Sequence, residues 1–301
     1  MLWGMLPVAL KELLAGMDAI TIVWYRFFAA GIVLFAWLTI QRKIPQILRQ
    51  AAQIKWFLLF AAVGLCINYF LFSYSLNFVN GETSEAVIQL TTLFLILGGV
   101  FLYKEPFLAV QKVGTGLIIC GLLLFFNDRL SGFLSLENRE TIGVIIVVFA
   151  AITWAVYALL QKQLLNSFSS VQILFLIYAF SSVALLPLIS PLSLFQLSEI
   201  QVYLLLFCCL NTIIAYGCFA EALNCWDASK VSAVLALAPL FTIGSLKLLV
   251  FFQPDYAFSD RLSMLSLLGA FLLVVGSALT ALMPVFQQYR ANKRGALTES
   301  V

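Results

Sequence analysis

Residues 69–94 read YFLFSYSLNFVNGETSEAVIQLTTLF, and residues 216–241 read YGCFAEALNCWDASKVSAVLALAPLF. When the first segment is moved along the chain from position 69 to position 216, the aromatic, Leu-Asn and small residues fall in the same order. The identical pairs are Tyr69 and Tyr216, Phe72 and Phe219, Leu76-Asn77 and Leu223-Asn224, Ala86-Val87 and Ala233-Val234, Leu90 and Leu237, and Leu93-Phe94 and Leu240-Phe241. Self-similarity of this kind indicates a fold built from repeated units.

The similarity extends outward from these segments in both directions. Trp3, Lys11 and Leu13 correspond to Trp154, Lys162 and Leu164, and Gly114 and Gly121 correspond to Gly269 and Gly276. Identities of Leu or Val are common by chance in apolar helices, whereas the Trp–Lys and Tyr–Phe–Leu-Asn correspondences are not. The sequence therefore predicts one unit over residues 1–128, a second over 141–285, and a tail over 286–301.

The composition is that of a membrane protein. Of the 301 residues, 63% are hydrophobic and 10% are charged, and the mean hydropathy is +1.04. A soluble domain would be about a quarter charged, and it could not hide this much apolar surface in one core. A membrane-spanning helix needs about twenty mostly apolar residues. The segments that satisfy this requirement are 1–17, 21–40, 56–76, 84–103, 112–126, 142–160, 171–189, 201–222, 229–250 and 263–283.

Each predicted unit holds an odd number of spans, so the second copy enters the membrane from the opposite side. Inverted repeats are the usual basis of alternating access around a central site. We therefore predict an all-α integral membrane protein of about ten transmembrane helices, arranged as two inverted five-helix repeats around a central cavity. The apolar stretch before Trp154 begins at Gly143, whereas Trp3 has two residues before it. We expect either a first helix shorter by roughly two turns or a start codon upstream.

Basic residues are concentrated on one side of the predicted topology. Connections that stay in the cytoplasm are rich in Lys and Arg. One set of alternate connections contains Arg42, Lys43, Arg49, Lys55, Lys104, Lys112, Lys162, Lys230, Arg290, Lys293 and Arg294. The other set contains only Arg129, Arg139 and Arg261 and carries acids such as Asp18, Glu82 and Asp255. We predict a multi-pass protein of the inner membrane with both termini in the cytoplasm.

Several sequence features are shared with a known family. They are Trp3-Gly4 with Lys11, Tyr25-Arg26, Tyr74-Ser75-Leu76-Asn77, LYKEP at 102–106, AEALN at 220–224 and ASKVSAVLALAPL at 228–240. Over nearly its whole length the chain resembles two repeats of the EamA family of the drug/metabolite transporter superfamily. The resemblance implies ten helices, a central cavity, and export or exchange of small metabolites that are amino-acid-like or drug-like. Two departures are Thr92 where the family often has proline, as at Pro239, and Gln253 at the position equivalent to Glu105.

Ionisable residues inside a span are costly and suggest function. Lys11 and Glu12 point about 100° apart on their helix, so we expect one of them to face the cavity. Arg26 and Lys247 lie close enough to an interface to snorkel, which favours structural roles. Glu221 is matched by Tyr74 in the first half, so it is our candidate for proton coupling, with Glu12 as a second. A salt bridge to a cytoplasmic lysine would explain Glu221 equally well.

A polar stripe and four aromatic residues are the other candidates for the substrate pathway. Glu85, Gln89 and Thr92 share one helix face, which either lines a pathway or bonds to another helix. Trp3, Trp154, Tyr69 and Tyr216 occupy equivalent positions in the two halves, and they form either a cavity wall for amphipathic or cationic substrates or an interfacial belt. Pro239 leaves a backbone carbonyl free for a ligand or a hinge, or produces a packing kink.

Other functional classes are disfavoured. The chain has no histidine, no HExxH motif and no phosphate-binding glycine loop, so neither an enzyme nor a metal or cofactor site is expected. Its six cysteines form no CxxC pair, and the net charge of +3 gives no sign of nucleic-acid binding. No channel filter is visible. A transporter of small molecules in the lipid bilayer is favoured, while a scaffold or regulatory subunit, and a homodimer, are left open.

The predicted topology can be tested with reporter fusions. We expect green fluorescent protein fused after the C-terminal residue, Val301, to fluoresce, since this end is predicted to be cytoplasmic. Alkaline phosphatase inserted at Phe258, in a connection of the opposite set, should be active because that enzyme needs an oxidising compartment. Active phosphatase at Val301 would contradict the predicted orientation.

Overall fold

The computed structural model describes residues 2–104, 106–128, 138–225, 234–254 and 256–298, and these contain helices and no strands. The α-helices are α1 (Leu2–Leu13), α2 (Ala19–Ile40), α3 (Ala52–Ser75), α4 (Gly81–Ile88), α5 (Leu90–Tyr103), α6 (Ala109–Phe125), α7 (Arg139–Leu164), α8 (Ser170–Leu185), α9 (Glu199–Cys225), α11 (Ala238–Phe252) and α12 (Met264–Thr298). Short 3₁₀ turns follow α2 and α8, at Ile47–Arg49, Leu186–Leu188 and Pro191–Gln196. Glu105, Lys230 and Ser232 lie outside the described residues.

Seven helical segments are long and apolar enough to cross a membrane, judged by length and composition. They are Ala19–Ile40, Ala52–Ser75, Gly81–Tyr103, Arg139–Leu164, Ser170–Leu188, Glu199–Ala222 and Met264–Ala281. Two shorter apolar helices, α6 and α11, and the 12-residue α1 fall where the sequence predicts the remaining spans. An all-helical membrane protein is therefore confirmed, and the total of ten spans stays a prediction.

The second helix of each predicted unit begins at a side-chain cap. The Asp18 carboxylate accepts a hydrogen bond from the Thr21 backbone N–H at 2.9 Å and caps α2. The Ser169 side chain accepts from the Gln172 backbone N–H, and the Gln172 side chain accepts from the Ser169 backbone N–H at 2.9 Å, which caps α8. These bonds satisfy backbone groups that have no partner inside a helix.

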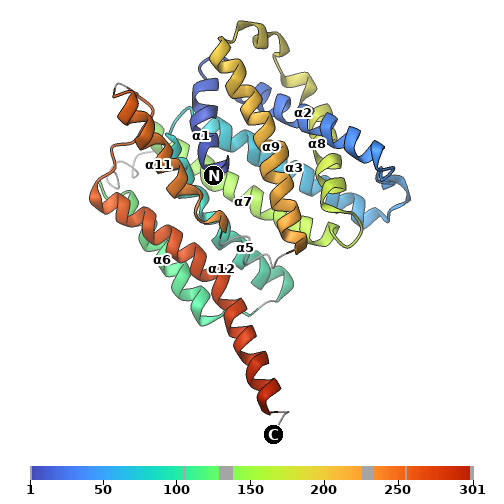
Figure 1. Ribbon diagram of the computed structural model, residues 1–301, viewed down its shortest axis with the longest axis vertical. Helices are drawn as coiled ribbons and strands as arrows, with labels where there is room; N and C mark the ends of the chain where they lie inside the picture. The colour runs from blue at the N-terminus through green and yellow to red at the C-terminus, as the bar shows by residue number, and fades with distance from the viewer. Residues whose placement is uncertain (1, 105, 129–137, 226–233, 255, 299–301) are drawn as a thin grey trace.

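Helices that are far apart in the sequence pack in pairs. α3 lies along α7, α1 along α9, and α2 along α8. α6 lies along α12 at one edge of the molecule (Figure 1), and α5 and α4 contact α7. Large apolar side chains cover the outside, including Ile40, Leu48 and Phe101, each at least 68% exposed. Such a surface suits lipid and would be unfavourable in water.

Two of the predicted spans differ from a continuous helix. The span expected over 84–103 is broken at Gln89, where α4 ends and α5 begins. In the span expected over 229–250, a turn at 236–237 precedes α11. Pro239 therefore lies in the first turn of α11, where a proline N–H is not needed, and not midway along a helix. The interruption of the helix therefore lies directly before Pro239, and whether it serves as a ligand site, a hinge or a packing kink stays a prediction.

Glycines allow α6 and α12 to approach closely. A Cβ on Gly121 would lie 2.8 Å from the Gly269 carbonyl oxygen, and a Cβ on Gly276 would lie 2.7 Å from the Gly114 carbonyl oxygen. Both distances are too short for real carbon atoms, so these positions need glycine. Small residues at the contact bring backbones together, which is how helices associate in membranes.

This packing predicts the effect of adding a methyl group. Gly121→Ala should destabilise the protein by about 1–3 kcal/mol, because the new Cβ meets backbone that cannot rotate away. Thermal unfolding of the purified protein in detergent measures the change as a lower Tm. Gly116→Ala, on the same helix but with open space around the added atom, should leave Tm unchanged or slightly raised. Equal Tm values for the two variants would contradict the close approach.

Candidate functional site

A cavity lies between helices of the two predicted units. Its volume is about 130 Å³. Residues of α1, α2, α3, α4, α5, α7 and α9, and residues around the start of α11, line it. Among the residues predicted for the pathway, those that line it are Trp3, Tyr69, Glu85, Gln89, Thr92, Trp154 and Tyr216.

Aromatic rings form one wall of this cavity. The ring centroid of Tyr216 lies 4.9 Å from that of Trp3 and 5.3 Å from that of Tyr69. Phe219 joins the wall, 5.6 Å from Trp3 and 5.9 Å from Trp154. Edge-to-face and tilted contacts at these separations stabilise aromatic clusters. The alternative of an interfacial belt is wrong for Tyr69 and Tyr216, which are 3% and 6% exposed.

Arg26 brings a positive charge to the cavity. Its side chain is 2% exposed, its Nε donates a hydrogen bond to Thr212 Oγ1 at 2.9 Å, and its guanidinium carbon lies 4.4 Å from the ring centroid of Tyr69. The expectation that Arg26 snorkels to an interface is wrong, because the hydrogen bond and the cation–π contact hold the side chain inside the protein. Arg26 lies about 10 Å along the helix axis from the start of α2. This depth inside the span is the signal in the sequence that could have predicted its burial.

Glu85 brings a carboxyl group to the same cavity. It is 5% exposed, on α4, one turn before the break at Gln89. Among the residues that the structure describes, no basic side chain forms an ion pair with Glu85, and no acidic side chain forms one with Arg26. Gln89 does bond to another helix, since its Oε1 accepts from Ser277 Oγ at 3.2 Å. A buried guanidinium and a buried carboxyl group thus face one cavity without forming an ion pair with each other.

The helix breaks also lie at the cavity. Thr91 and Thr92, in the first turn of α5, and Ala236 and Ala238, at the start of α11, are lining residues. Short hydrogen-bonded turns join the helices at these breaks, with the Thr92 N–H donating to the Gln89 carbonyl and the Leu240 N–H to the Leu237 carbonyl. Asn68 is buried and also lines the cavity. No pattern in the sequence singled it out, and its side chain donates to the Ala150 carbonyl at 2.9 Å.

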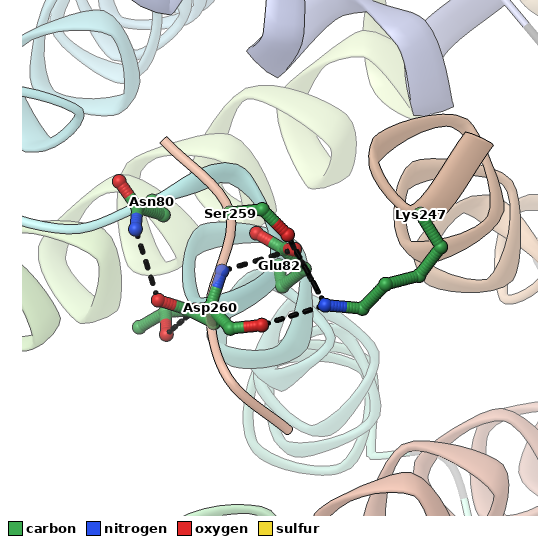
Figure 2. A network of polar contacts seen from close by, with 6 residues as sticks. Asn80, Glu82, Lys247, Ser259 and Asp260 are labelled. Atoms are coloured by element: carbon green, nitrogen blue, oxygen red, sulfur yellow. Dashed lines mark hydrogen bonds and ion pairs between the residues drawn. The ribbon is translucent and has the colours of Figure 1, made fainter. Parts of the chain in front are cut away.

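A second polar cluster surrounds the first turn of α4 (Figure 2). Glu82 is fully buried, and its Oε1 accepts hydrogen bonds from Ser259 Oγ at 2.7 Å and from the Asp260 backbone N–H at 3.2 Å. The Asp260 carboxylate accepts from Asn80 Nδ2 at 3.0 Å and from Thr83 Oγ1 at 2.7 Å.

The remaining predicted residues lie outside the cavity lining. Lys11 donates to the carbonyl oxygens of Leu76 and Val79, and it does not face the cavity. Glu12 lies near Tyr256, whose phenol has a pKa raised by burial and by the Glu12 carboxylate. Glu221 is exposed on the last turns of α9, and Pro239 is buried in α11. The coupling roles of Glu12 and Glu221 stay predictions. No group of His, Cys, Asp and Glu in the described part of the chain could hold a metal ion.

Comparison with known proteins agrees with this architecture. The model of the EamA-like transporter family matches two segments, residues 1–127 and 141–282. A transporter of Haemophilus influenzae is 40% identical over 282 residues, which cover 94% of this chain and 92% of that protein. The inner membrane transporter YhbE of Escherichia coli K12 is also 40% identical, over 93% of this chain and 88% of that protein.

Two more distant similarities complete the comparison. An Escherichia coli K12 protein named "Probable amino-acid metabolite efflux pump" is 22% identical over 229 residues, 71% of this chain and 73% of that protein. A crystal structure of another protein superposes with a TM-score of 0.65 at 17% identity, over 94% of each chain, which shows a shared fold. With two matched segments and relatives 40% identical over most of its length, the chain belongs to the EamA-like transporter family and is a multi-pass transporter of the inner membrane.

Proposed function

We propose that this transporter exports small zwitterionic, amino-acid-like metabolites by alternating access between two inverted repeats. The observation that carries the proposal is that the buried guanidinium of Arg26 and the buried carboxyl group of Glu85 lie on one cavity and form no ion pair. In a medium of low dielectric constant an uncompensated charge is costly. A molecule with one carboxylate and one ammonium group would compensate both at once.

The chemistry of each group fits one end of such a molecule. The Arg26 guanidinium already uses Nε for Thr212, and its other N–H groups can bind a carboxylate, a pairing in which charge-assisted hydrogen bonds are strong. The Glu85 carboxylate accepts hydrogen bonds from an ammonium group. The rings of Trp3 and Tyr216 offer an apolar surface for the side chain of the substrate.

The pairing of helices supports the inverted repeat. If residues 141–285 repeat residues 1–128, then α7 corresponds to α1, α8 to α2, α9 to α3 and α12 to α6. Under a two-fold relation the pairs α3–α7 and α1–α9 exchange, while α2–α8 and α6–α12 map onto themselves, and these are the pairs that pack. The breaks at Gln89 and at 236–237 are separated by the same 147 positions as Tyr69 and Tyr216. Broken helices at a central site are typical of transporters with inverted repeats.

Similarity to the family supports both the proposed direction of transport and the proposed class of substrate. The resemblance to EamA exporters favours export, and one relative is named for efflux of amino-acid metabolites. A drug-like organic cation is the competing substrate class. It would use Glu85 and the aromatic wall but would leave Arg26 uncompensated, so the zwitterion fits the observed charges better.

Efflux from proteoliposomes tests the proposal. Vesicles containing the purified protein are loaded with a mixed pool of amino acids, organic cations and neutral metabolites, and the loss of each compound is followed by mass spectrometry with and without a pH gradient. We expect protein-dependent loss of zwitterionic amino acids. Loss of organic cations alone would refute the substrate class, and no protein-dependent loss of any compound would refute the transport function.

Substitution of the two charges tests the binding mode. Arg26→Lys keeps the charge but removes the planar pair of donors, and Glu85→Gln keeps the shape but removes the charge. Each should lower efflux of the zwitterionic substrate about tenfold or more, since a charge-assisted hydrogen bond contributes about 1.5–3 kcal/mol. Arg49→Lys, at an exposed arginine, should transport normally. Normal efflux by both cavity variants would show that the substrate binds elsewhere.

A further inference from the structure

Residues 256–263 connect α11 to α12 and cross the N-terminal end of α4. We call this segment the strap. The distribution of Lys and Arg predicts that this end faces away from the cytoplasm. The strap and α4 are joined by reciprocal hydrogen bonds (Figure 2). The Glu82 carboxylate on α4 accepts from Ser259 and Asp260 on the strap, and the Asp260 carboxylate accepts from Asn80 and Thr83 at the start of α4.

Two lysines connect the strap to neighbouring helices. Lys247 on α11 donates to the Asp260 carbonyl at 2.6 Å and to Ser259 Oγ at 3.1 Å, and its Nζ lies 3.9 Å from Glu82 Oε1. Lys11 on α1 lies 5.3 Å from the ring centroid of Phe258 on the strap. The same Lys11 amine binds the carbonyls of Leu76 and Val79, just before α4. α1, α4 and α11 are therefore held together at this end through the strap.

The cluster has one unsatisfied member. Glu82 Oε2 is buried and has no hydrogen-bond partner among the described residues. Leaving a buried carboxylate oxygen without a donor is unfavourable, and few such groups occur in native proteins. If the strap lifts, water can reach Oε2 while the bonds to Ser259 and Asp260 are lost. Hydration of Oε2 would offset part of the cost of opening.

The strap lies directly beyond the cavity. Glu82 and Glu85 are three residues apart on α4, so they are neighbours on one face of the helix. Glu85 lines the cavity, and Glu82 is covered by the strap. Movement of the strap away from α4 would expose the next turn of the helix, which leads to Glu85.

We propose that the strap is an extracytoplasmic gate, held closed by the Glu82, Asp260 and Lys247 latch. The proposal rests on the proposed function, since a gate needs a pathway to close. Transporters that alternate access must break one set of contacts on each side of the central site. In the arrangement seen here the latch is formed and the outer end is closed. Release of the latch opens the cavity to the outside.

Labelling of a cavity residue from outside the cell tests the gate. Thr92→Cys places a thiol in the cavity, and a membrane-impermeant maleimide is added to intact cells. Labelling at position 92 is measured by mass spectrometry of the peptide, so the native cysteines can stay. Adding Glu82→Gln or Asp260→Asn should raise the labelling rate about tenfold, the shift expected when charge-assisted hydrogen bonds of the latch are weakened.

Two further variants keep the result interpretable. Lys247→Gln changes a side chain that is 44% exposed, so it opens the latch with little risk to folding, and it should also raise labelling. Glu199→Gln, at an exposed carboxylate predicted to lie on the same side, should not. Labelling at position 92 that is equal in all four variants and the parent would overturn the gate. The assay needs no substrate, so failure of the efflux experiment would refute the proposed function without deciding this result.

Discussion

A polypeptide backbone surrounded by lipid has no water to bind, and each unsatisfied N–H or C=O group in that environment is costly. This constraint explains why the described residues form helices and no strands. It also gives meaning to the two places where helical bonding stops inside a predicted span. Gln89 and Ala236, at the two breaks, are buried and line the cavity. Irregular backbone is tolerated at membrane depth where it lines a protected or water-filled space.

The same scarcity of water governs the charged side chains. Arg26 is held by the Thr212 hydroxyl and the Tyr69 ring, neither of which carries a compensating charge. Glu85 faces the same space from α4. A membrane protein that retains two such groups without pairing them gives up stability, and sites of this kind are usually functional. In the proposed function these two groups are the features of the cavity that select a substrate.

The two polar regions of α4 form one system along the helix. Its first turn carries Glu82, which is bonded to the strap, and the following turn carries Glu85, which faces the cavity. On the same side of the molecule as α11, glycine contacts bring α6 and α12 together (Figure 1). Close packing of backbone against backbone is rigid, whereas hydrogen bonds between a strap and a helix end can exchange with water. Motion is therefore easier to accommodate at the strap than between α6 and α12.

The sequence by itself determined the membrane class, the helical fold, the family and seven residues of the cavity lining, because apolar length and internal repetition can be read without coordinates. The sequence did not reveal the break at Gln89, because Thr92 stands where a proline would have marked that break. The position of Arg26 in the sequence also led to the wrong prediction that this side chain lies at an interface. Only the tertiary structure decided these points. Whether a charge faces lipid, water or a cavity depends on which helices pack against it, and the contacts of Arg26 with α3 and α9 join residues far apart in the chain. The strap over Glu82 is likewise a contact between distant segments, which no local pattern of residues records.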